Sequence, residues 1–246
     1  MYPELFRIGD FSVSTFGLML AVAFLVGSWI ASIRMGEEGL EPDSTTLLIY
    51  VMVGGIVGSK IYFAVDVWLQ TRQPFASLLF SRDGITWYGG LIGATLLGAI
   101  GCRIHGIPVK TFADCTAVSG AVGQAIGRVG CFLVGDDYGR VTDVAWGMSF
   151  PEGAPPTQEP VHPTQLYEIA WLLPVAALLW RRRRKSPFLF GEYVALNGIG
   201  RLVIEHWRVN PKVALGLTEP QLIGLGLIAL GMGGWAYFRR RRAAGY

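Results

Sequence analysis

The chain has 246 residues, of which 52% are hydrophobic, 16% are charged and 33 are glycine. This balance excludes an ordinary water-soluble domain and is typical of a membrane protein that crosses the bilayer several times. The net charge of +3 becomes informative only when the basic residues are placed along the chain. The three cysteines form neither a disulfide framework nor a CxxC metal pattern, so we expect small buried side chains.

Seven apolar stretches are long enough to cross a bilayer, which takes about 20 residues each. They cover about 12–33, 47–69, 87–104, 112–134, 164–180, 187–207 and 219–238. We therefore predict an all-α integral membrane protein with about seven transmembrane helices, folded as one domain over residues 1–246. The fourth and sixth stretches contain charged residues, so we expect parts of them to be shielded from lipid.

The basic residues indicate how such a bundle is oriented. With seven spans, one side of the membrane receives most of them, namely Arg34, Arg103, Lys110, Arg181–Lys185 and Arg239–Arg242. The positive-inside rule then predicts a cytoplasmic C-terminus and an N-terminus outside. The two arginine runs read as topology anchors beside lipid headgroups, and no accompanying motif favours a nucleic-acid partner.

The third stretch opens with the motif WYGGLIGA, which places Tyr88 near the outer boundary of the membrane. Gly89 and Gly90 allow a neighbouring backbone or a lipid headgroup to come close. Tyr88 is either a site residue or an aromatic residue of the membrane interface, where tyrosine is common.

Lys60, Arg128 and Arg201 fall well inside predicted spans, where a charge costs a few kcal/mol unless it is paired or reaches water. For Lys60, snorkelling or an ion pair explains the position as well as function does. Arg128 and Arg201 each belong to a larger polar group, which favours a functional role. The possible structural partners are Asp66, Asp114 and Glu205.

Residues 135–163 carry loop chemistry and contain five of the chain's prolines. We predict that this segment forms a small extracytoplasmic cap, and we call it the cap segment. It leads into the motif VHPTQLYE, which opens the fifth stretch. His162 there either locks the cap segment by hydrogen bonding or takes part in catalysis.

The sixth stretch contains Arg201, Glu205 and Arg208 at positions i, i+4 and i+7, which share one face of a helix. Glu205 can hold one arginine while the other stays available to an anion. The planar guanidinium group suits phosphate because it donates two parallel hydrogen bonds. The predicted ligand is a phospholipid that enters sideways from the bilayer.

The segment GRVGCFLVGDDYG resembles the signature of prolipoprotein diacylglyceryl transferase, an integral-membrane enzyme of bacterial lipoprotein maturation. WYGGLIGA, VHPTQLYE and GRLVIEHWR extend the resemblance in the same order. It implies transfer of the diacylglyceryl group of phosphatidylglycerol to a prolipoprotein's lipobox cysteine thiol, with a thioether formed and glycerol phosphate released. The partners implied are phosphatidylglycerol, the prolipoprotein signal peptide and other membrane lipids. The location implied is the outer face of the cytoplasmic (inner) membrane, with neither a metal nor an organic cofactor.

The resemblance also implies the site. Arg128 matches the signature arginine of the family, and Arg201 matches its second essential arginine. Further positions that match are Asp114, Gly139, His162, Gln165, Glu168, Glu205 and Arg208. Four site positions depart from the family pattern: Tyr88 replaces histidine, Cys131 asparagine, Asp136 glutamate and Asn197 tyrosine.

These departures leave the general base open. Tyr88, His162 and His206 are the candidates. Two other functions also stay open. One is a family paralogue that uses another acceptor, and the other is a non-enzymatic phospholipid-binding or transport protein. A transporter is disfavoured because the sequence lacks a broken-helix repeat signal.

Overall fold

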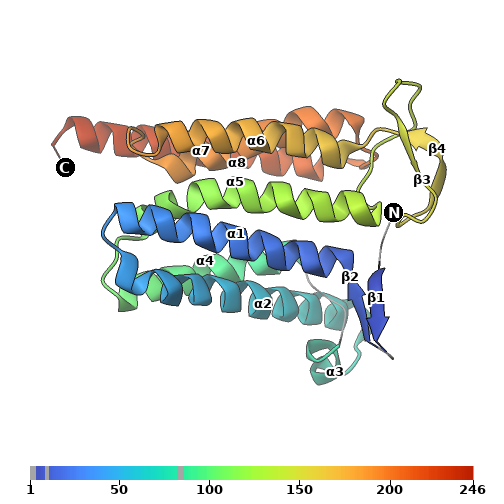
Figure 1. Cartoon of the computed structure of the whole chain (residues 1–246), viewed down its shortest axis with the longest axis horizontal. Coiled ribbons are helices and arrows are strands. Elements are labelled where there is room, and N and C mark those ends of the chain that lie inside the picture. The colour runs from blue at the N-terminus through green and yellow to red at the C-terminus, as the bar shows by residue number, and fades with distance from the viewer. Residues whose placement is uncertain (1–3, 9–10, 82–85, 246) are drawn as a thin grey trace. The chain divides into compact units, whose positions relative to one another are not determined.

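A computed structural model describes residues 4–8, 11–81 and 86–245 of the chain. Most of this part is helical (Figure 1). Its long helices are α1 (Thr15–Glu37), α2 (Glu41–Thr71), α4 (Trp87–Ile104), α5 (Val109–Val134), α6 (Thr164–Arg182), α7 (Leu189–Ile204) and α8 (Glu219–Ala243). Each coincides with one predicted stretch. Two short helices, α3 (Phe75–Leu79) and η1 (Glu205–Trp207), were not predicted as separate elements.

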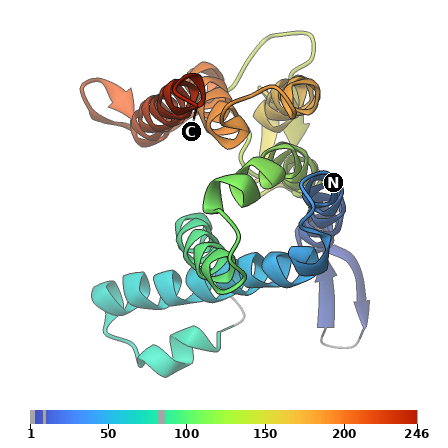
Figure 2. The ribbon, with the colours of Figure 1, turned by 90° about the vertical axis from the view of Figure 1, so that its left-hand side faces the viewer.

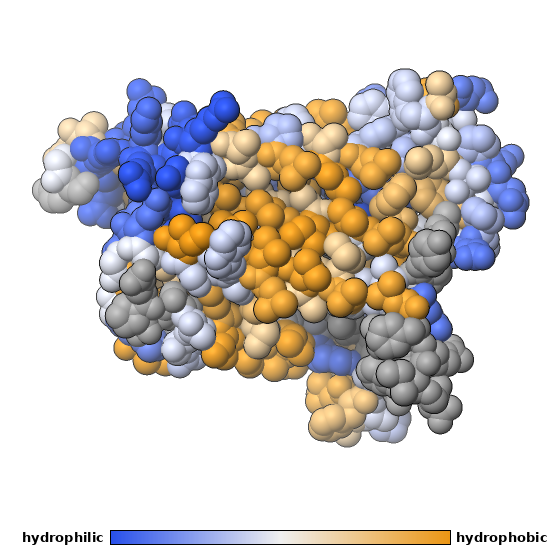
Figure 3. Space-filling model, in the orientation of Figure 1, coloured by the Kyte–Doolittle hydropathy of each residue, from blue (hydrophilic) through white to orange (hydrophobic). Residues whose placement is uncertain are grey.

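Four helical segments in the described part are long and apolar enough to cross a membrane. They are Thr15–Glu37, Thr45–Thr71, Val109–Val134 and Glu219–Ala243, and a shorter apolar helix covers Gly89–Ile104. Large apolar side chains such as Leu25 and Trp29 are exposed along α1. Figure 3 shows apolar residues gathered over the middle of the helices. These features agree with an all-α membrane protein, whereas the count of seven spans stays a prediction.

In the described part, three two-stranded antiparallel sheets accompany the helices, and none of them was predicted from the sequence. Their strands are β1 (Glu4–Ile8) with β2 (Phe11–Ser14), β3 (Met148–Phe150) with β4 (Thr157–Val161), and β5 (Lys212–Ala214) with β6 (Leu217–Thr218). Leu215 and Gly216 form the two-residue turn between β5 and β6, both with positive φ. Such turns match the twist of the strands that they join, and the hairpin lies beside α8 (Figure 2).

The chain divides into two compact units. The first contains residues 1–31 and 113–246, and the second contains residues 32–112. The single domain over residues 1–246 stays a prediction.

In the first unit, α5, α6 and α7 share an apolar core. It contains Ala117, Val118, Ala121, Val175, Ala176, Leu179 and Leu189. The alanines of α5 are small, so the helices approach closely enough to seat larger residues between them. Glycines bring α7 against α8, since a Cβ at Gly198 would meet the carbonyl oxygen of Gly224 (Figure 2). Thr218 and Gln221 form a capping box that fixes the start of α8.

In the second unit, α2 and α4 pack through facing glycines. A Cβ added at Gly54, Gly58 or Gly93 would meet backbone of the opposite helix. Gly89 packs in the same way against the carbonyl of Gly58. Such small residues replace side-chain packing by direct backbone contact, as is common between membrane helices.

Candidate functional site

Three arginines converge on the carboxylate of Glu168, which α6 presents near its first turn. Arg128 of α5 lies 2.6 Å from Glu168 (Nε to Oε2). Arg208 and Arg201 approach the other oxygen, Oε1, at 3.2 and 3.4 Å. The Glu168 side chain is only 9% exposed, so these contacts replace the water it lost on burial. We call Arg128, Arg201, Arg208, Glu168 and Asp137 the arginine cluster.

Asp137 completes the cluster from the loop after α5. Its Oδ2 lies 2.7 Å from Nη1 of Arg128, and its Oδ1 lies 2.6 Å from Nη2 of Arg208. Burial acts to raise the pKa of Asp137, but the charges of Arg208 and Arg128 outweigh it and hold the pKa below its usual value. Asp137 has a positive φ of 60°, a conformation that aspartate adopts more readily than most residues.

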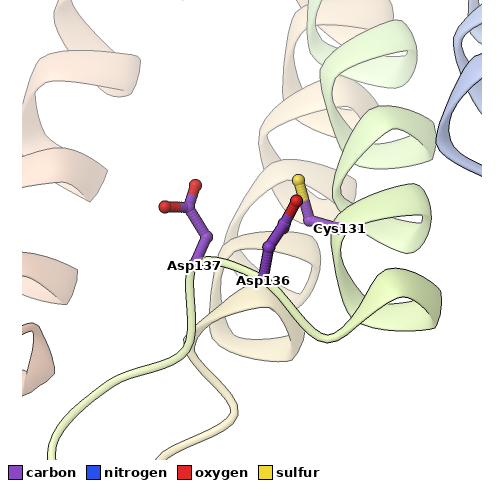
Figure 4. A group of neighbouring side chains, drawn as sticks. All are labelled: Cys131, Asp136 and Asp137. Carbon is purple, nitrogen blue, oxygen red and sulfur yellow. The ribbon is translucent and has the colours of Figure 1, made fainter. Parts of the chain in front are cut away.

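Asp136, which was predicted as a site residue, faces Cys131 and not the arginines that bind Asp137. Figure 4 shows its carboxylate beside the thiol of Cys131, while Asp137 points away from both. Burial raises the pKa of Asp136, and its backbone carbonyl accepts a hydrogen bond from the side chain of Gln165. Cys131 also lies near the cluster, because Nη1 of Arg128 is 3.6 Å from its sulfur.

Cys131, Asp136 and Asp137 could each offer one ligand atom to a metal ion, since these atoms lie within 4.8 Å of one another. However, Arg128 and Arg208 both bind Asp137, and their positive charges oppose a cation there. Guanidinium groups that surround an exposed carboxylate instead favour an anionic ligand.

The predicted helical face of Arg201, Glu205 and Arg208 is only partly correct. α7 ends at Ile204 and continues as the 3-10 helix η1, so Arg208 follows the helical segment. Glu205 still lies 3.6 Å from Arg201 (Oε2 to Nη2). Its other oxygen accepts hydrogen bonds from Thr218 and Asn210 at 2.8 and 2.7 Å. Glu205 therefore ties the end of α7 to the start of α8.

Asn197 lies one turn before Arg201 and shares side-chain hydrogen bonds with Gln124 and Tyr193, neither of which was predicted as a site residue. It donates to Oε1 of Gln124 on α5 at 2.5 Å, and Gln124 donates back at 3.4 Å. The hydroxyl of Tyr193 also donates to Oε1 of Gln124, at 3.2 Å. We call Gln124, Tyr193 and Asn197 the amide layer.

His162 belongs to an aromatic cluster at the base of the cap segment. Its Nδ1 lies 3.0 Å from the hydroxyl of Tyr167, which accepts a hydrogen bond from Trp146 at 2.7 Å. Its ring packs at a tilt against Trp207, with centroids 6.3 Å apart. Burial lowers the pKa of His162, with a smaller effect of the Arg140 charge. This surrounding supports the locking role, and the catalytic role stays a prediction.

Gly139 fastens the cap segment to the ends of α6 and α7. Its N–H donates to the carbonyl of His162 at 2.8 Å, and Arg140 donates to the carbonyl of Trp207 at 2.8 Å. A Cβ at Gly139 would collide with that same carbonyl of Trp207. The close approach of two backbones explains why glycine stands here.

The remaining predicted site residues lie outside the arginine cluster or outside the described part. Asp114 accepts a hydrogen bond from the backbone of Phe190 at 2.9 Å, about 21 Å along α5 from Arg128. Gly89 and Gly90 belong to the second unit, where a Cβ at Gly90 would meet Oγ of Ser59. The side chain of Tyr88 lies outside the described part of the structure.

Comparison with known proteins places this arrangement in a family. The family model described as prolipoprotein diacylglyceryl transferase matches residues 3–237. A phosphatidylglycerol–prolipoprotein diacylglyceryl transferase of Allorhizobium ampelinum is 32% identical, and the match covers 98% of this chain and 92% of the relative. Proteins of the same name from a Nostoc species and from Dehalococcoides mccartyi are each 34% identical. The Nostoc match covers 97% of this chain and 90% of the relative, and the Dehalococcoides match covers 98% and 95%. The chain therefore belongs to the prolipoprotein diacylglyceryl transferase family.

Proposed function

We propose that the chain transfers the diacylglyceryl group of phosphatidylglycerol to the lipobox cysteine thiol of a prolipoprotein. The observation that carries this proposal, beside the family membership, is the convergence of Arg128, Arg201 and Arg208 on one carboxylate. Three guanidinium groups that gather at one end of the helices α5 and α7 suit a phosphate that is attached to apolar chains.

Asp137 marks the position that the phosphate takes. Its side chain is 44% exposed, and it bridges Arg128 and Arg208 with short contacts. An incoming phosphate offers the same kind of oxygen atoms and carries the same sign of charge. It can therefore replace Asp137 on the two arginines, while the less exposed Glu168 continues to orient them.

The arginines then act on the leaving group. The thiolate sulfur of the acceptor attacks the glyceryl carbon that bears the phosphate, forming the C–S bond as the C–O bond breaks. Glycerol phosphate departs with the electron pair, and the thiol proton passes to a base. Charge develops on the leaving oxygen, where fixed guanidinium groups stabilise it. The base candidates remain Tyr88, His162 and His206.

The proposal includes a location in the bacterial cytoplasmic membrane, crossed by seven helices, with the N-terminus outside and the C-terminus in the cytoplasm. The basic runs at the ends of α6 and α8 lie together, since Arg242 donates to the carbonyl of Lys185 at 3.1 Å. The arginine cluster and the cap segment lie at the opposite end of the first unit (Figure 1). This polarity supports a reaction near the outer leaflet.

A transfer assay tests the proposal. Purified protein is incubated with phosphatidylglycerol and a lipobox peptide, and mass spectrometry measures the diacylglyceryl thioether. We expect product from the wild type and a loss of at least about a hundredfold with Arg128→Ala, because a charged contact to the leaving group is removed. Arg184→Ala, an exposed arginine at the end of α6, is the matched control and should keep activity.

The same assay separates the other functions. Product formed on a different acceptor, with none on the lipobox peptide, would indicate the paralogue. Movement of phospholipid between leaflets without any product would instead indicate a transporter and would contradict the proposed chemistry.

A further inference from the structure

The amide layer and the arginine cluster repeat the same pairing of α5 with α7. Gln124 pairs with Asn197, 73 positions later in the chain. Arg128 and Arg201, also 73 positions apart by subtraction of their numbers, share Glu168. The two helices therefore run parallel here, and the amide layer lies one turn, about 6 Å, deeper along both.

The hydrogen bonds of the amide layer use one of the two N–H donors of Gln124 and leave the other available to a ligand. The Oε1 atom of Gln124 already accepts from Asn197 and Tyr193, at 2.5 and 3.2 Å. Each carboxamide carries two N–H donors. Asn197 bonds both Gln124 and the hydroxyl of Tyr193, whereas the contacts within the described part use only one donor of Gln124. Both residues are half-buried in the first unit, so a ligand can reach them. The layer thus suits a ligand group that only accepts hydrogen bonds.

We propose that the amide layer is a subsite for the ester carbonyls of the diacylglycerol part of the lipid substrate. This inference rests on the proposed function, which supplies the phospholipid. An ester carbonyl is an acceptor without a donor, and it lies a few bonds below the phosphate on the glycerol backbone. An acceptor at this depth satisfies N–H groups that water reaches poorly in a bilayer.

The subsite explains how the reacting bond is oriented. The glyceryl carbon under attack lies between the phosphate and the ester groups. With the phosphate on Arg128 and Arg208 and a carbonyl on Gln124, both neighbours of that carbon are fixed. Holding the C–O bond in one direction favours in-line attack by the thiolate.

Two lipids test this subsite: phosphatidylglycerol and its dialkyl ether analogue, which has the same headgroup and chains but lacks the carbonyls. We expect the wild type to bind and use the ester lipid about three- to tenfold better, the range for one or two hydrogen bonds. Gln124→Leu and Asn197→Leu should bring this ratio close to one. Asn197→Gln, which keeps the carboxamide, should recover part of it.

Tyr193→Phe is the matched control in the same layer, because it removes a hydroxyl but leaves the carboxamide donors in place. It should keep the preference for the ester lipid. Equal use of both lipids by the wild type would overturn the subsite, and this comparison needs no variant to fold. An equal loss with both lipids in the leucine variants would also overturn it, since the layer would then only align α5 with α7.

Binding of the two lipids, measured by native mass spectrometry, separates this inference from the proposed function. A binding preference for the ester lipid without any product would support the subsite and contradict the transfer. Equal binding with product formed from both lipids would contradict the subsite alone.

Discussion

At the scale of single residues, the arginine cluster contains two counter-ions, the buried Glu168 and the exposed Asp137. Glu168 stands at a position that matches the family, whereas Asp137 was not among the predicted site residues. Arg128 and Arg201 are conspicuous because they interrupt apolar stretches, which is costly unless they are paired. However, the backbone conformation decides which of the two adjacent aspartates, Asp136 or Asp137, faces the arginines. The positive φ of Asp137 turns it towards Arg128, whereas Asp136 lies beside Cys131. No periodicity in the sequence carries that information.

Gln124 was missed for a related reason. A single glutamine on an apolar helix is polar without being charged, so it shows nothing like the cost that marks Arg128. Only its partner Asn197, in α7, gives it a role, and such a pair depends on the register of two helices. The sequence offered one signal, namely that Gln124 stands one turn before Arg128.

Asp137 carries a prediction that follows from its place on the two arginines. Asp137→Asn removes the negative charge that competes with the phosphate but keeps the size of the side chain. We expect the KM for phosphatidylglycerol to fall about three- to tenfold in a transfer assay, as a charged hydrogen bond to the arginines is weakened. The kcat should not rise, because the arginines that stabilise the leaving group are unchanged.

Asp143→Asn is the control, since it makes the same change of charge at an exposed position of the cap segment. It should leave the KM as in the wild type. A higher KM in Asp137→Asn would mean that this carboxylate orients Arg128 and Arg208 and does not occupy the phosphate position.

At the scale of elements, long helices were predictable and short strands were not. The seven predicted stretches each contain one long helix, because twenty apolar residues leave few alternatives. Strands of two to five residues, such as Leu217–Thr218, carry too little periodicity to be recognised. The sixth stretch was also predicted too long. Its helix ends at Ile204, and the 3-10 turn that follows lets Glu205 bond Thr218.

The aromatic cluster under the cap segment predicts a pH-dependent stability. The hydroxyl of Tyr167 accepts a hydrogen bond from Trp146, so its own proton is available to His162. An unprotonated Nδ1 of His162 can accept that proton in a hydrogen bond. The pKa of His162 is lowered in the folded protein, so below its usual value of about 6.5 the unfolded chain binds the proton more readily. The contribution of His162 to the free energy of unfolding should therefore be fully present above this pH, and it should be lost as the pH falls below it.

Thermal unfolding of the detergent-solubilised protein, followed by tryptophan fluorescence, measures this effect. We expect the wild-type midpoint to fall between pH 7.5 and pH 5.5, roughly the range around the ordinary histidine pKa, and to fall less in His162→Gln. His206→Gln, at an exposed position on η1, should keep the wild-type dependence. Identical pH profiles for wild type and His162→Gln would show that His162 does not carry the effect.

At the scale of the whole molecule, the first unit has a chemical polarity that the family membership alone does not supply. Arginines paired with carboxylates gather at the end where α5 and α7 finish, beside the cap segment. The two consecutive runs of basic residues, Arg181–Lys185 and Arg239–Arg242, gather at the other end, where Arg242 contacts Lys185. Most charges of these basic runs are exposed, so the membrane potential and the charge bias of cytoplasmic loops bear on them.

This polarity predicts the orientation of the chain, and cysteine labelling in intact cells tests it. Gln158→Cys lies in β4 of the cap segment and Ala244→Cys follows α8, and both positions are exposed. A membrane-impermeant maleimide should label Cys at 158 in intact cells and Cys at 244 only after lysis, because the positive-inside rule places the arginine run of α8 in the cytoplasm. The wild type is the control, since its three cysteines are buried. Labelling of both positions in intact cells would contradict an odd number of spans between them. The opposite pattern would reverse the orientation and would move the arginine cluster away from the outer leaflet, where a secreted lipobox peptide meets its lipid.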